Sequence, residues 1–127
     1  MGLSIKPAEW AIQHQPAANT VATISKAADA GGRHIATGLT VALAGTSASG
    51  LVTVNLRDGA TGAGTILWSA SMVILAGDSK SVSLGGMQIA GTKNTAMTLE
   101  FDAAGGAATE ETVSLIGYTC KENYVGV

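Results

Sequence analysis

The sequence predicts an all-β fold: a β-sandwich of about eight antiparallel strands, jelly-roll-like, with an N-terminal extended or short helical arm. After residue 20, apolar and polar residues alternate with a period of two, glycine-containing turns separate the runs, and no helical pattern intervenes. The 127 residues have the size of one domain. We expect an arm over residues 1–19 and a sandwich domain over residues 20–127.

The alternating runs place the expected strands one by one. The clearest run sets Met97, Leu99 and Phe101 on one face, opposite three polar residues. Large apolar side chains gain about 1.5–3 kcal/mol each when fully buried, so we expect Trp68, Leu99 and Phe101 inside the sandwich. Strands are expected near residues 20–28, 33–44, 50–58, 65–74, 79–85, 87–91, 96–103 and 111–120.

The first residues follow a different pattern. Pro7 and Pro16 bracket a segment that could form two helical turns, since proline is tolerated near a helix start and ends a helix. Two turns are unstable alone in water and must dock on something. We therefore expect Ile5, Trp10 and Ile12 to anchor the arm on a partner. The alternative is that the arm folds back over an open end of its own sandwich.

Charge and composition narrow the class of partner. Charged residues make up only 13%, the formal net charge is -2, and no basic run occurs, so neither nucleic acid nor an anionic membrane is an expected partner. No stretch approaches the roughly 20 apolar residues of a membrane span, and no signal peptide is recognised. A single cysteine, Cys120, excludes an intrachain disulfide.

A charge-poor surface favours self-association. Ala36, Thr40 and Ala42 fall on faces that the alternation marks as outward, and such small apolar surface is often covered by a partner. We expect a homotrimer. A soluble monomer coated with Thr and Ser is the alternative.

Residues with catalytic or ligand-binding chemistry are sparse. The two histidines lie in no nucleophile or metal-binding motif, and Cys120 is best interpreted as a packed thiol. Glu100 and Asp102 share one strand face, which is usually solvated, and Glu110 with Glu111 suggests a charged loop. The sequence therefore predicts that the protein is not an enzyme and that it has no catalytic residue, cofactor or bound metal.

The glycine-rich segment over residues 59–64 only superficially resembles a phosphate-binding loop. It lacks the Lys-Ser/Thr pair that such a loop needs, and a strand follows it instead of a helix. We interpret it as a hairpin connection.

Residues 57–68, Arg-Asp-Gly-Ala-Thr-Gly-Ala-Gly-Thr-Ile-Leu-Trp, and residues 96–101, Ala-Met-Thr-Leu-Glu-Phe, carry a resemblance. With the Ala/Gly/Thr/Ser-rich texture, they make residues 20–120 similar to small accessory virion proteins of tailed bacteriophages, and most similar to head decoration (cement) proteins. The resemblance implies a jelly-roll or related sandwich, often trimeric. It also implies contacts with the major capsid protein at the outer capsid surface of the virion, after synthesis in the host cytoplasm. A tail, fibre or baseplate subunit with a receptor- or glycan-binding sandwich is the alternative.

Overall fold

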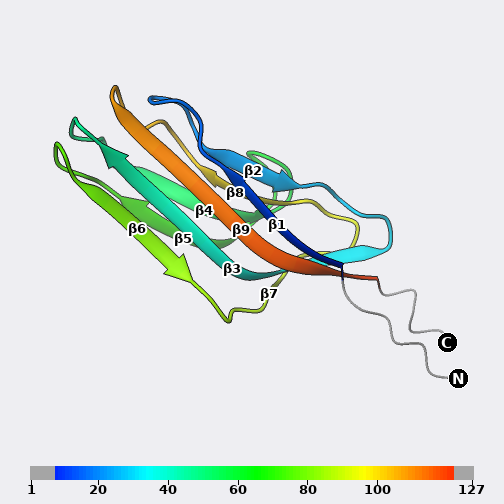
Figure 1. Ribbon diagram of the computed structural model, residues 1–127. Coiled ribbons are helices and arrows are strands. Elements are labelled where there is room, and N and C mark those ends of the chain that lie inside the picture. Colours follow the sequence, from blue (N-terminus) through cyan, green and yellow to red (C-terminus); the bar gives the residue numbers. More distant parts are fainter. Residues whose placement is uncertain (1–7, 122–127) are drawn as a thin grey trace, which may run out of the picture.

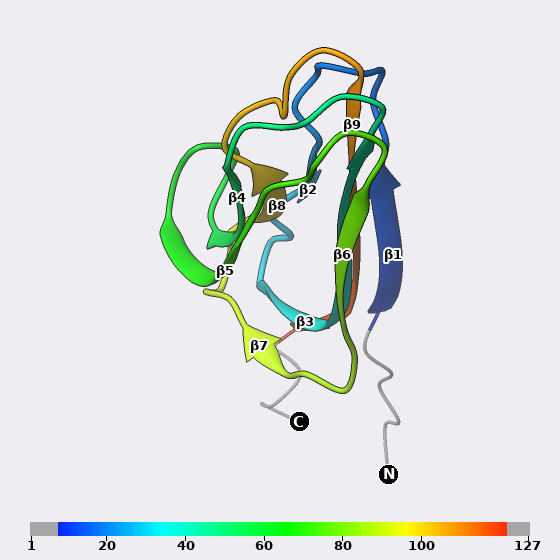
Figure 2. The ribbon, with the colours of Figure 1, turned by 90° about the vertical axis from the view of Figure 1, so that its left-hand side faces the viewer.

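The computed structural model describes residues 8–121 as two antiparallel sheets packed face to face (Figures 1 and 2). Sheet A has the order β1 (Ala8–His14), β9 (Thr109–Lys121), β3 (Gly32–Gly45), β6 (Ser79–Leu84), with the short β7 (Ile89–Ala90) also paired to β3. Sheet B has the order β2 (Thr23–Lys26), β8 (Met97–Phe101), β4 (Val52–Asp58), β5 (Thr65–Met72). No helix of the described segment is long and apolar enough to cross a membrane.

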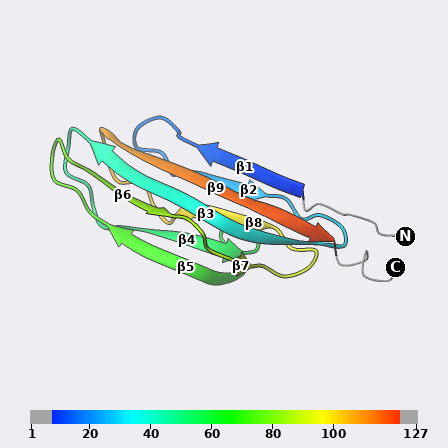
Figure 3. The ribbon, with the colours of Figure 1, turned by 60° about the horizontal axis from the view of Figure 1, so that its bottom comes forward.

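The strand order is that of a jelly roll. β4 pairs with β5, β3 with β6, β2 with β8, and β1 with β9, so the chain behaves as one long hairpin rolled into two sheets. The first strand, β1, and the last, β9, therefore lie side by side (Figure 3). This topology confirms the predicted fold class.

The core lies between the two sheets. Leu99 and Phe101 are almost fully buried, as predicted, whereas Trp68 is half-buried and packs against the margin of the core. Leu56 pairs with Trp68 and Arg57 pairs with Ile66, so Leu67 is an extra, unpaired residue in β5. This bulge turns Ile66 outward, where it is 49% exposed. The buried apolar residues are Ala22, Ala36, Leu39, Val41, Leu43, Val52, Val54, Leu56, Met72, Ile74, Met97, Leu99, Phe101, Val113 and Leu115.

A second bulge corrects the expected face of Ala36. The register of β3 against β9 shifts between Ala36 and Gly38, with Thr37 as the extra residue. The inward face thus runs through Ala36 before the bulge and through Leu39 after it, and Ala36 is fully buried. The prediction of an outward Ala36 is wrong because strict alternation cannot anticipate an inserted residue. Thr40 is exposed and Ala42 partly exposed, on the outer face as expected.

The expected short helix in the N-terminal arm is also wrong for the described residues. Residues 8–14 form β1, an edge strand that pairs along its whole length with β9. Tertiary pairing overrides the helix preference of this short segment, because the long β9 offers it a complete partner. These residues are part of sheet A, while residues 1–7 and 122–127 lie outside the described part of the chain.

Residues 59–64 connect β4 to β5, which confirms the predicted hairpin. The Thr98 hydroxyl donates to the Gly59 carbonyl at 2.8 Å, and the Gly62 amide donates to the Glu100 carboxylate at 2.8 Å. The connection therefore folds over the outer face of β8. Gly62 and Gly64 adopt positive φ angles of 73° and 84°, which explains glycine at both turn positions.

Candidate binding surfaces

Trp10 is positioned by a buried polar chain at the β1 edge of the core. Its indole Nε1 donates to Thr119 Oγ1 at 3.0 Å, and this hydroxyl lies 2.7 Å from His34 Nδ1. His34 Nε2 lies 2.7 Å from the Ala27 carbonyl, which can only accept, so Nε2 carries a proton. These hydrogen bonds hold the Trp10 ring edge-on to the His34 ring, with the two ring centroids 5.8 Å apart.

Gly117 makes room for the Trp10 ring. A Cβ built at this position would lie 2.8 Å from Trp10 Cη2 and would also meet the Ile35 carbonyl. Only glycine lets the indole approach β9 this closely. The close packing at Gly117 of β9 thus involves Trp10 of β1 and the Ile35 carbonyl of β3.

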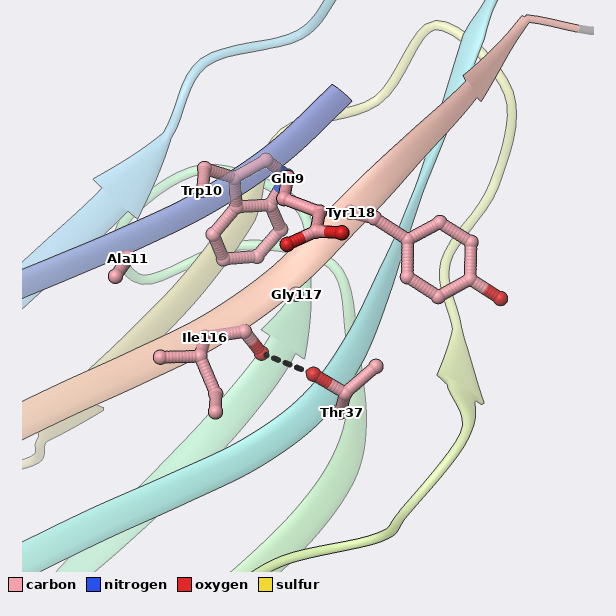
Figure 4. A pocket seen from close by; sticks show the side chains of 7 residues that line it. All are labelled: Glu9, Trp10, Ala11, Thr37, Ile116, Gly117 and Tyr118. Atoms are coloured by element: carbon pink, nitrogen blue, oxygen red, sulfur yellow. Dashed lines mark hydrogen bonds between the residues drawn. The ribbon is translucent and has the colours of Figure 1, made fainter. Parts of the chain in front are cut away.

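A shallow groove of about 700 Å³ runs beside Trp10 over β1 and β9. Glu9 and Tyr118 are opposite each other across the two strands, as are Ala11 and Ile116, and Figure 4 shows these side chains around the groove. The Tyr118 hydroxyl donates to Gln88 at 2.9 Å. An aromatic ring, a carboxylate and an apolar floor thus line one depression, together with Thr37 and Gly117.

Glu100 is buried, which contradicts the expected solvated face of β8. Its side chain accepts a hydrogen bond from Arg57 Nε at 3.1 Å as well as the one from the Gly62 amide. Only 6% of Glu100 is exposed, while Asp102 is exposed and accepts from the Thr53 amide. The two carboxylates do not form a site, because each is occupied by a different structural contact.

Glu111 is also buried rather than part of a charged loop. It lies within β9 on the inward face, 1% exposed, and its Oε1 accepts from the Ala22 amide at 2.9 Å. Its Oε2 has no hydrogen-bond partner. Desolvation raises the pKa of Glu111 to about 7, with a further contribution from the charge on Asp102.

Large apolar side chains are exposed at one end of sheet B. Leu51 is 71% exposed, Val73 44% and Leu75 75%. Val52 and Met72 are the last pair of the ladder between β4 and β5, and Leu51 and Val73 directly follow that pair on the two chains. Sequence periodicity missed this cluster, because exposure at a strand end depends on where the sheets stop.

Of the three residues predicted to contact a partner, two lie in β1 and one lies outside the described residues. Ile5 lies outside the described residues, whereas Trp10 and Ile12 are half-buried and pack against the chain's own core. Trp10 and Ile12 therefore have contacts within their own sandwich, as part of an edge strand. A contact of Ile5, Trp10 or Ile12 with a partner stays a prediction. Within residues 8–121, no group of three or more His, Cys, Asp or Glu side chains could hold a metal ion.

No family model matches the chain, and no curated protein matches its sequence. Among solved structures, one described as Bacillus endospore appendages that form a novel family of disulfide-linked pili is 20% identical. It has a TM-score of 0.43, with 94% of this chain and 98% of that chain covered. The coat protein of tobacco streak virus is 7% identical with a TM-score of 0.39, covering 95% of this chain and 92% of that one. Both likenesses are too distant to carry a functional argument.

Proposed function

We propose that this protein is a non-enzymatic virion structural protein that decorates and stabilises a bacteriophage capsid through contacts with the major capsid protein. The observation that carries the proposal is a charge-poor jelly roll that exposes large apolar side chains, including Leu51, Leu75 and Ile116. Apolar exposure of this kind is typical of surfaces that a partner covers.

Two further points support this assignment. Jelly rolls build viral capsid domains, so the fold agrees with a virion role by analogy. The Ala/Gly/Thr/Ser-rich sequence resembles that of head decoration proteins. The outer capsid surface is the proposed location, reached after synthesis in the host cytoplasm.

Particle labelling tests the proposal. An antibody against the purified chain should mark the heads of source particles in negative-stain electron microscopy. Purified chain should also co-sediment with heads from which it has been stripped. Label confined to tails would favour a tail, fibre or baseplate subunit, and absence of label from all particles would contradict both virion assignments.

The groove beside Trp10 favours a second candidate, a glycan-binding tail or fibre module. Sugar sites commonly combine an aromatic platform with polar groups, and Tyr118 and Glu9 meet across β1 and β9. Glycan-array binding that is lost in Tyr118→Ala but kept in Tyr118→Phe would support this function. Absence of binding by the intact chain would contradict it.

A further inference from the structure

β5 presents an open sheet edge. It is the last strand of sheet B, and between Thr65 and Met72 its ladder runs to β4 alone within the described chain. Figures 2 and 3 both show β5 at the outer margin of the sandwich. One side of its backbone therefore offers amide and carbonyl groups for a further strand.

The β5 edge lacks the usual protection against pairing. Natural proteins place charges, prolines or very short strands at exposed edges. β1 carries Glu9, β6 carries Lys80, and β2 has four residues ending at Lys26. From Thr65 to Gly77 the sequence contains no Asp, Glu, Lys, Arg or Pro. Among the described edges, β5 is the long one without such a residue.

Exposed apolar side chains flank this edge at both ends. Ile66 is 49% exposed near the start of β5, and Val73 and Leu75 are exposed just after its end. Trp68 is half-buried at the margin of the core. If two β5 strands paired antiparallel, the apolar residues near the start of one strand would face those just after the end of the other.

We propose that β5 pairs antiparallel with β5 of a second copy of this chain, about a two-fold axis at Ala70. In this register Ser69 lies opposite Ser71 on the outer face, and Trp68 lies opposite Met72 on the inner face. Within residues 68–72 each opposed pair is polar with polar or apolar with apolar, and no like charges meet because the strand has none.

The two-fold pairing joins the two copies of sheet B into one continuous sheet. A specific interface buries about 1,200 Å² or more in total, so side chains beyond the ladder must contribute. Ile66 near the start of β5, and Val73 and Leu75 just after its end, are the exposed apolar side chains that flank this edge. This association goes beyond the proposed function and yields a dimer, in place of the homotrimer that the sequence favours.

Charge-swap variants test the pairing on purified protein without particles. Sedimentation velocity should show a concentration-dependent dimer for the natural chain. Ser69→Lys/Ser71→Lys and Ser69→Glu/Ser71→Glu should each be monomeric, because four like charges would face one another across the axis. An equimolar mixture of the two variants should restore the dimer. Both serines are exposed, but Ser69 donates to Asn55 and Ser71 shares a hydrogen bond with Thr53. The variants lose these two contacts, so circular dichroism must first show that each is folded.

A matched control places the same charges on another edge. Ala11→Lys/Gln13→Lys puts two lysines at the same spacing on exposed positions of β1 and should leave dimerisation unchanged. A natural chain that stays monomeric at high micromolar concentration would overturn the proposal. So would a trimer, or a dimer that survives in both β5 variants. Each of these results leaves the particle-labelling test of the proposed function unaffected.

Discussion

Glu111 is an acid held on the inner face of a sandwich. One of its oxygens binds the Ala22 amide and so connects β9 to the segment that leads into β2. The other oxygen has no partner, and ionising the side chain there would leave a buried charge that is only partly compensated. Protonation relieves this cost, which is the physical reason that the pKa rises.

Stability should therefore fall as pH rises through the range in which Glu111 titrates. The group binds its proton more tightly in the folded state, with a pKa of about 7, than in the unfolded state, where its value is near 4.5. Between these values the folded state holds more protons, so the free energy of unfolding decreases with increasing pH and then levels off above about 7. Urea unfolding across this range measures the slope.

Glu111→Gln should remove that slope while keeping an oxygen that can accept from the Ala22 amide. Glu110→Gln is the matched control. Glu110 is the preceding residue in β9, and its side chain is exposed and accepts a hydrogen bond from Gln15. The Lys121 hydrogen bond lowers the pKa of Asp29 below 3.8, so Asp29 affects stability only at more acidic pH. A slope that persists unchanged in Glu111→Gln would refute the assignment.

β1 is a strand whose alternating pattern is obscured in the sequence. Trp10, Ile12 and His14 point inward while Glu9, Ala11 and Gln13 point outward, so the period of two is present. The two prolines and the Ala, Glu and Gln content obscured it. The deciding contact lies more than a hundred residues away, where Ala8 pairs with Thr119, and no local pattern reports such a partner.

The inward face of β1 should contribute to stability, and its outward face should not. Trp10→Ala/Ile12→Ala removes two half-buried side chains from the core margin, at a cost of about 1–2 kcal/mol each. Glu9→Ala/Gln13→Ala changes exposed positions of the same strand and should melt like the natural chain. Thermal unfolding of the two double variants gives the comparison. Equal melting temperatures would mean that β1 does not pack on this core.

Local patterning predicted the other strands well, and its errors have physical causes. The expected strands over residues 33–44 and 65–74 overlap β3 and β5 closely. The bulge at Thr37 shifted the faces within β3, so Ala36 turned inward, and the bulge at Leu67 put Ile66 and Trp68 on opposite faces of β5. Buried acids such as Glu100 and Glu111 were misplaced because their partners are distant backbone amides. The candidate surfaces depend on such distant contacts, so the sequence predicted them less well than it predicted the strands.

For the whole molecule, the jelly roll brings the two ends of the described chain together. Ala8 begins β1 and Lys121 ends β9, and the adjacent strands place both at the same end of sheet A (Figure 1). The fold thus depends on contacts between strands that are far apart in sequence. Such non-local pairing makes folding slow relative to helical domains, since loop closure precedes the contacts that stabilise it.

The closeness of these ends predicts that the chain tolerates circular permutation. Joining Lys121 to Ala8 through a flexible linker and opening the chain between Ser47 and Ala48 cuts an exposed connection and leaves every strand intact. This permutant should fold cooperatively and keep the far-ultraviolet circular dichroism of a β-protein. A second permutant, opened between Leu115 and Ile116, cuts the central β9, which pairs with both β1 and β3, and should fail to fold. If the two permutants were equally stable in thermal unfolding, continuity of β9 would not be what holds sheet A together.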